Sequence, residues 1–205
     1  QVKRLDWKQG LAAKIEQAKT LPPLTQLPAD EAALAPLEFR MVRISGRWLK
    51  DKEFHLFPRW YQGKQGYWII TPLMLKDGRV VLVNRGWVPL EKKEPKTRPE
   101  TAVRGNATVE GIVRIGEDRH YFTPTNSPEK NIWFGRDIAA MASAAELSSV
   151  VPAMLDRVGT QDAATLPVPS NGTITLRNDH LSYILTWYGI ALGILVIFLS
   201  YHRKK

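Results

Sequence analysis

The sequence predicts an α+β protein: a β-rich soluble domain, an antiparallel barrel or sandwich with flanking helices, followed by a C-terminal transmembrane helix. Short runs of β-branched and aromatic residues recur between residues 39 and 115 with turn residues between them, a pattern typical of all-β sandwiches and barrels. Residues 181–201 form a run of 21 positions without a charge. About 20 apolar residues are needed to cross a hydrocarbon core roughly 30 Å thick, so this run predicts a membrane span.

The chain begins with a predicted amphipathic helix over residues 2–19. Trp7, Leu11 and Ile15 recur at a spacing of four, and basic residues occupy other positions. Pro22-Pro23 ends this helix, and the Pro- and Ala-rich residues 20–37 are expected to form a linker or a short helix. Residues 1–37 therefore precede a β-rich domain that we expect to cover residues 38–180.

Strands are expected within this domain wherever β-branched and aromatic residues cluster. Asp77-Gly78 separates two of these clusters and predicts an antiparallel hairpin with a type I′ turn, which needs positive φ at both central residues. Gly46 suggests a bend or bulge within the first strand, and Asp137 is a candidate N-cap for a helix over residues 138–145. The expected strands are residues 39–48, 53–60, 67–75, 80–88, 108–115 and 132–134, with residues 150–158 and 173–177 closing the domain. Residues 62–66, 89–102 and 159–172 are expected to be loops.

The flanks of the uncharged run indicate its orientation. Tyr183, Trp187 and Tyr201 are typical of interfacial aromatic belts, and residues 202–205 form a basic tail. The positive-inside rule places this tail in the cytoplasm and the β-rich domain on the other side, or in the equivalent organelle compartment. A buried core helix is the alternative, but such a helix normally carries a polar face.

Composition excludes several classes of site. The chain has no cysteine, so disulfides, thiolate metal centres and a cysteine nucleophile are excluded. The net charge of +9 is scattered along the chain, which suits a surface near anionic lipid or an acidic partner better than a nucleic-acid groove. The sequence lacks a phosphate-binding glycine loop, a zinc-binding H-E-x-x-H helix and a G-x-S-x-G elbow, so we predict no catalytic residue and no enzyme.

The four histidines are the remaining chemical candidates: His55, His120, His180 and His202. His55 alternates with apolar residues and is expected to face solvent on a strand, while His120 lies in a charged turn and His202 in the basic tail. His180 stands at the mouth of the predicted span, where its imidazole could ligate an iron and where Tyr183 and Trp187 lie close to its side of a helix. The alternative is that His180 simply caps the helix.

Five segments give the chain a resemblance to a known family. They are Gln1-Val2-Lys3-Arg4 with Trp7-Lys8, Gly66-Tyr67-Trp68 with Thr71-Pro72-Leu73, Val83-Asn84-Arg85-Gly86-Trp87-Val88-Pro89, Asn131-Ile132-Trp133-Phe134 with Arg136-Asp137, and Asn178-Asp179-His180-Leu181-Ser182-Tyr183 with Thr186-Trp187. In this order they resemble the Surfeit locus protein 1 family, assembly factors for cytochrome c oxidase. The resemblance covers nearly the whole chain.

The resemblance implies a specific role. Family members have two transmembrane helices around a domain outside the cytoplasm or in the intermembrane space, so the first span should end just before Gln1. They help to mature the catalytic subunit of the oxidase, and bacterial members bind heme a, with the histidine of the last motif as the iron ligand. That histidine is His180 here, and Asp179 stands where a second asparagine is common. The implied location is the bacterial inner membrane with a periplasmic domain, or the mitochondrial inner membrane in a eukaryote.

We therefore predict a membrane-anchored assembly factor that delivers heme a to the oxidase catalytic subunit, with heme a synthase as a further partner. The expected cofactor contacts are His180 to the iron, Tyr183 and Trp187 as walls, and Arg85 to a heme propionate or to an acidic client. A structural Arg85 paired with a local carboxylate is the alternative for that residue. For the whole chain, the alternatives are a purely structural chaperone that never touches heme and, less favoured, a membrane-bound hydrolase.

Overall fold

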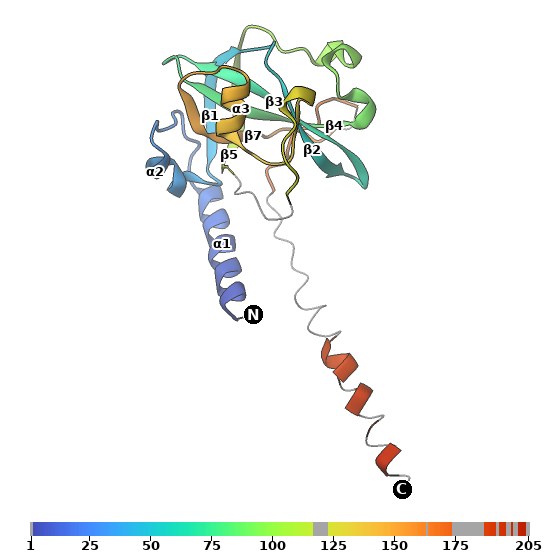
Figure 1. Cartoon of the computed structure of the whole chain (residues 1–205). Helices are drawn as coiled ribbons and strands as arrows, with labels where there is room; N and C mark the ends of the chain where they lie inside the picture. Colours follow the sequence, from blue (N-terminus) through green and yellow to red (C-terminus); the bar gives the residue numbers. More distant parts are fainter. Residues whose placement is uncertain are drawn as a thin grey trace. The chain divides into compact units, whose positions relative to one another are not determined.

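A computed structural model describes residues 2–116, 123–162, 164–173, 187–191, 193–195, 198 and 201–203. The chain divides into two compact units, Gln1–Thr173 and Ile174–Lys205. The first unit contains every strand described below, and the second contains helical residues within 187–202 (Figure 1). No helix among the described residues is both long enough and apolar enough to span a membrane. The predicted span over residues 181–201 lies partly outside the described residues.

The first unit is built on a seven-stranded sheet with the order β1-β5-β7-β4-β3-β2-β6. An additional pairing between β1 and β3 closes β1, β5, β7, β4 and β3 into a barrel, from which β2 and β6 extend. This arrangement confirms the α+β class and the barrel alternative. The strands are β1 (Met41–Trp48), β2 (Phe54–Tyr61), β3 (Lys64–Leu75), β4 (Val80–Pro89), β5 (Asn106–Ile115), β6 (Ile132–Trp133) and β7 (Val150–Arg157).

The expectation of a purely antiparallel sheet was wrong. β4 pairs with β7 in parallel, and so does β2 with β6. β5, β6 and α3 lie between β4 and β7 in the sequence, and a connection of this length lets two strands meet in parallel. A pattern of short apolar runs reports strands but not the direction in which distant strands meet.

The hairpin predicted around Asp77-Gly78 is confirmed, because β3 and β4 pair from Met74 opposite Val80 to Gly66 opposite Pro89. Its turn differs from the expectation. Gly78 has a positive φ of 84°, but Asp77 does not, so the loop is a three-residue turn rather than type I′. Positive φ at two successive residues occurs instead at Gln62-Gly63, the two-residue turn between β2 and β3. The loop expected at residues 62–66 is therefore largely strand.

Gly46 marks a close approach of strands rather than a bulge. It pairs with Leu75 of β3 and with Ala107 of β5, at the seam where the barrel closes. A Cβ placed at this position would lie 2.5 Å from the carbonyl oxygen of Met74. The absence of a side chain therefore permits β1 to lie against β3.

Helices and two apolar clusters complete the unit. The helices are α1 (Val2–Thr20), α2 (Glu31–Leu34) and α3 (Ile138–Ala144), of which the last begins at the predicted cap: Asp137 accepts a hydrogen bond of 3.1 Å from the main-chain N–H of Ala140. Ile15 and Ala18 of α1 are buried, so one side of that helix packs on the domain. One cluster of apolar side chains fills the barrel, and a second lies between β2, β6 and α3.

Candidate functional site

The structure describes two of the four predicted cofactor residues, Arg85 and Trp187. His180 and Tyr183 lie outside the described residues, and so does His120. Trp187 lies in the second unit and is 61% exposed. Arg85 lies on β4 in the first unit, so Arg85 and Trp187 are described in different units.

Arg85 occupies a β-bulge in the outer half of the predicted hairpin. Ile69 pairs with Gly86 and Ile70 pairs with Asn84, which leaves Arg85 as the extra residue on β4. The Arg85 side chain is only 6% exposed and donates a hydrogen bond to the carbonyl oxygen of Thr101. Its Nη1 lies 3.7 Å from Glu53 Oε2. This ion pair matches the alternative given above, in which Arg85 is a structural residue paired with a local carboxylate. A contact between Arg85 and a heme propionate stays a prediction.

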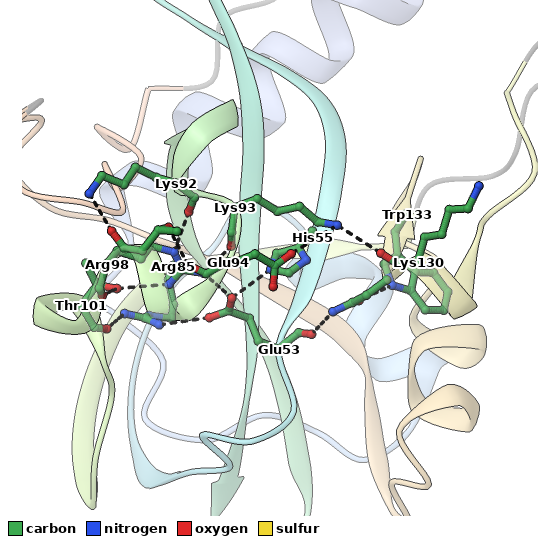
Figure 2. A network of polar contacts seen from close by, with 12 residues as sticks. Glu53, His55, Arg85, Lys92, Lys93, Glu94, Arg98, Thr101, Lys130 and Trp133 are labelled. Carbon is green, nitrogen blue, oxygen red and sulfur yellow. Dashed lines mark hydrogen bonds and ion pairs between the residues drawn. The ribbon is translucent and has the colours of Figure 1, made fainter.

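Glu53 is the centre of a nearly buried polar cluster, the Glu53 cluster: Glu53, His55, Arg85, Arg98 and Thr101 (Figure 2). Glu53 precedes β2, and its Oε1 accepts hydrogen bonds from Arg98 Nη2 and, at 3.0 Å, from His55 Nε2. Because Oε2 faces Arg85, one carboxylate serves two guanidinium groups and an imidazole. The cluster therefore holds more positive than negative charge inside the fold.

Arg98 ties the segment after β4 to this cluster. Three short 3-10 turns, η2 (Leu90–Lys92), η3 (Pro95–Thr97) and η4 (Pro99–Thr101), replace the loop expected at residues 89–102. The Arg98 side chain is 1% exposed and donates to the carbonyl oxygens of Lys92 at 2.9 Å and Lys93 at 3.1 Å. Its Nη1 donates to Thr101 Oγ1 at 3.1 Å. One guanidinium group thus satisfies main-chain acceptors that regular secondary structure leaves open.

The expectation that His55 faces solvent was wrong, because His55 is 3% exposed. Alternation along β2 predicts one solvated face, but both faces of its first part, Phe54–Leu56, are covered. Phe54 and Leu56 pack in the apolar cluster with Trp133, while His55 faces Glu53 and the ring of Tyr67. His55 Nδ1 has no hydrogen-bond partner among the described residues.

The electrostatics of the cluster favour a charged Glu53. Burial raises the pKa of Glu53, but hydrogen bonds from His55 and Arg98 and the charge of Arg98 outweigh it and hold the pKa below the ordinary value of 4.5. Burial lowers the pKa of Arg85 to about 10, and the charge of Glu53 opposes that effect. Both groups are therefore ionised at neutral pH, and the attraction between them is available to stabilise the fold.

A second buried cluster, the Asp156 cluster, consists of Asp156, Asn84, Arg114 and Arg136. Asp156 Oδ1 accepts from Asn84 Nδ2 at 2.9 Å, and Oδ2 lies 3.1 Å from Arg136 Nη2 and 3.6 Å from Arg114 Nη1. Asn84 and Arg85 are neighbours on the bulge, so β4 contributes one residue to each cluster. Sequence reasoning did not find either cluster, because Glu53, Arg98 and Asp156 belong to no local motif that would mark them.

The polar groups of the two clusters are bonded mostly to one another and to the main chain. The Thr101 hydroxyl donates to the carbonyl oxygen of Arg98 at 2.8 Å, so it is engaged in the local turn. The described residues contain no group of three or more His, Cys, Asp or Glu side chains that could hold a metal ion. The clusters join β2, β4, β5, β7 and the 3-10 turns.

Comparison with known proteins agrees with the motifs. The model of the SURF1 family matches residues 1–192. The chain is 37% identical to Surfeit locus protein 1 of Mus musculus over 205 aligned residues, covering 93% of this chain and 66% of the mouse protein. It is 39% identical to a SURF1-like protein of Drosophila melanogaster and 35% identical to Surfeit locus protein 1 of Homo sapiens, covering 93% of this chain and 68% of each relative. The chain belongs to the SURF1 family.

Proposed function

We propose that this protein is a membrane-anchored assembly factor for cytochrome c oxidase that holds heme a for insertion into the catalytic subunit. The observation that carries the proposal is the position of His180. It lies immediately before the uncharged run of residues 181–201 and within the part of the chain that matches the family. A large apolar porphyrin with a polar edge suits such a boundary between water and lipid.

The residues at this boundary supply the groups that such a cofactor needs. A neutral imidazole is a good axial ligand for heme iron, and the chain has no thiolate to compete with it. Tyr183 and Trp187 follow at spacings of three and seven, and the Trp187 ring is 61% exposed, so it can lie against an apolar ligand. Arg85 is already bonded to Glu53 and Thr101, and a propionate would have to displace Glu53 to reach it. We therefore assign the cofactor contacts to His180, Tyr183 and Trp187.

The proposal includes a location and partners. The uncharged run anchors the chain in the bacterial inner membrane, with the β-rich domain in the periplasm, or in the mitochondrial inner membrane in a eukaryote. The oxidase catalytic subunit receives the cofactor, and heme a synthase supplies it. No covalent step is needed, because the protein acts by holding and transferring a cofactor.

The test is the heme spectrum of the full chain, purified in detergent after co-expression with the enzymes that make heme a. We expect heme bands in the wild type and their loss or shift in His180→Ala. His202→Ala is a matched control, because it removes a histidine from the other flank of the same run. A wild-type spectrum and stoichiometry in His180→Ala would show that the ligand assignment is wrong. A wild type that carries no heme would instead favour the purely structural chaperone.

A further inference from the structure

Trp60 is the most exposed large apolar side chain in the described part of the first unit. It is 67% exposed, and in that part of the chain the other exposed large apolar residues are Leu90 at 46% and Leu21 at 41%. Trp60 lies on β2 just before the turn at Gln62-Gly63, in a segment that we call the hairpin tip, residues 59–65. Exposure of so large an apolar ring at a turn requires an explanation, because burial of a ring this size is normally favourable.

Leu90 lies at the same end of the sheet as Trp60. It follows Pro89, which pairs with Gly66, and Gly66 in turn pairs with Arg59 of the hairpin tip. Figure 1 shows that β2 and β3 end in a hairpin that projects from the body of the first unit. Two of the exposed apolar side chains thus belong to one end of the domain.

The charge of the hairpin tip is positive. Lys64 is exposed and Arg59 is half-buried, and the sequence has no Asp or Glu between Glu53 and Asp77. The guanidinium of Arg59 lies 4.6 Å from the ring centre of Trp68, and its Nη1 donates to the carbonyl oxygen of Pro58 at 2.9 Å, so the charged end of this side chain lies against the sheet. The hairpin tip thus carries an exposed indole and basic residues but no carboxylate. These groups complement a lipid surface, which has anionic phosphates outside and apolar chains beneath them.

The hairpin tip is firmly held. The ring of Tyr61 packs on Trp87 with 5.4 Å between centroids, and Trp87 Nε1 donates to the carbonyl oxygen of Arg59 at 3.2 Å. Trp87 also pairs with Val168, with hydrogen bonds of 2.8 Å in both directions. The last described segment of the unit therefore runs beside the strand that supports the tip.

The chain limits how far Thr173, the last described residue of the first unit, can be from the predicted span. Seven residues separate Thr173 from residue 181, and a chain of that length spans at most about 29 Å when fully extended. Val168, which pairs with Trp87, lies five residues before Thr173 in the same last described segment. Such a short tether gives the hairpin tip a high effective concentration at the membrane surface, so that weak contacts become significant.

We propose that the hairpin tip is a second membrane contact, with Trp60 inserted at headgroup level and Lys64 on lipid phosphates. The inference rests on the membrane anchoring proposed above. A bilayer fits better than a protein partner, because one Trp and one Leu offer far less than the roughly 800 Å² per side of a stable protein interface. Indole rings favour the membrane interface, and basic residues near an anionic surface strengthen such binding.

The absence of cysteine permits a direct test with single reporter sites. Gln62→Cys in the full chain, labelled with an environment-sensitive fluorophore, places the probe at the hairpin tip. Lys76→Cys is the matched control, because it is exposed at the other end of β3, roughly 36 Å away along the strand. Both proteins are reconstituted in nanodiscs of phosphatidylcholine with phosphatidylglycerol and in nanodiscs of phosphatidylcholine alone. Lipids that carry a quencher report the depth of the probe.

We expect blue-shifted emission and lipid quenching at position 62 but not at position 76. Trp60→Ala should abolish both signals without changing the thermal unfolding temperature, because the side chain is largely exposed. Lys64→Gln should lower the ratio of docked to undocked tips by about fivefold in anionic discs only. Variants that dock as well as the wild type would overturn the roles given to these two side chains.

Two results distinguish this inference from the anchoring proposal. A chain that floats with vesicles after carbonate extraction, but whose probe at position 62 stays in water, refutes the contact and leaves the anchor intact. A chain that does not float refutes the anchor and this inference with it. A probe that is shielded by an added oxidase subunit and not by lipid alone also overturns the inference, because the tip then binds protein.

Discussion

The replacement of Glu53 by Gln tests the importance of the buried charge cluster. Glu53→Gln keeps the shape of the side chain but removes its charge, which leaves Arg85 and Arg98 buried without a counterion. These side chains are 6% and 1% exposed, so water cannot replace the carboxylate. Loss of one partner from a buried ion pair costs about 3–5 kcal/mol, a large share of the roughly 5–15 kcal/mol that stabilises a typical domain.

Glu110→Gln is the matched control. Glu110 pairs with Arg43 at 3.4 Å, but both side chains are more than half exposed, and exposed pairs contribute about 0–1 kcal/mol. The assay is chemical unfolding of the full chain in detergent, followed by tryptophan fluorescence, with the midpoint and slope compared among the three proteins. Equal free energies of unfolding for the two variants would refute the reasoning that the Glu53 cluster stabilises the fold.

Three further predictions follow from the same geometry. The pKa of Glu53 is lower in the folded than in the unfolded chain, so its contribution to the free energy of unfolding is present above about pH 4.5 and is lost as the pH falls through the folded pKa. The unfolding temperature should therefore drop in that range, and it should drop less in Glu53→Gln. Gly86→Ala should severely destabilise the fold, because φ is +134° and a Cβ would lie 2.2 Å from the carbonyl oxygen of Val168. Gly10 lies on the exposed part of a helix with open space around it, so Gly10→Ala should raise the free energy of unfolding by about 0.5–1 kcal/mol in the same assay. Asp137→Ala should cost about 1 kcal/mol by removing the N-cap of α3, and an unchanged unfolding midpoint would contradict that role.

Local features of the fold could be predicted from the sequence because their causes are local. β-branched and aromatic runs select extended backbone, and the glycine in Asp77-Gly78 supplies the positive φ that its turn needs. Asp137 precedes a stretch of helix-forming residues and caps them through its own carboxylate. In these cases the residues that determine the structure lie within a few positions of one another.

Features that depend on distant partners could not be predicted in this way. Whether His55 faces solvent depends on the segment after β4, whose Arg98 meets Glu53 from 45 positions away. The parallel pairing of β4 with β7 likewise depends on a connection that crosses the sheet. The bulge at Arg85 adds one residue to β4, and this shifts which residues of the strand face the two charge clusters.

Two of the motifs that mark the family consist of residues that are bonded within the domain. In the segment Asn84-Arg85-Gly86-Trp87, Asn84 bonds to Asp156, Arg85 pairs with Glu53, Gly86 admits Val168, and Trp87 bonds to Arg59.

The segment that begins at Asn131 has the same character. Asn131 has a left-handed backbone with φ of 50° and donates to the carbonyl oxygen of Glu53 at 2.6 Å, while Trp133 Nε1 donates to Asn131 Oδ1 at 3.0 Å. The polar side chains in these two motifs are therefore bonded within the domain, and we expect their substitution to lower stability before it alters any cofactor spectrum. His180 lies outside the described residues, and the proposed function predicts that a variant there changes the cofactor spectrum. Measuring both quantities on the same variants separates a damaged fold from a lost ligand.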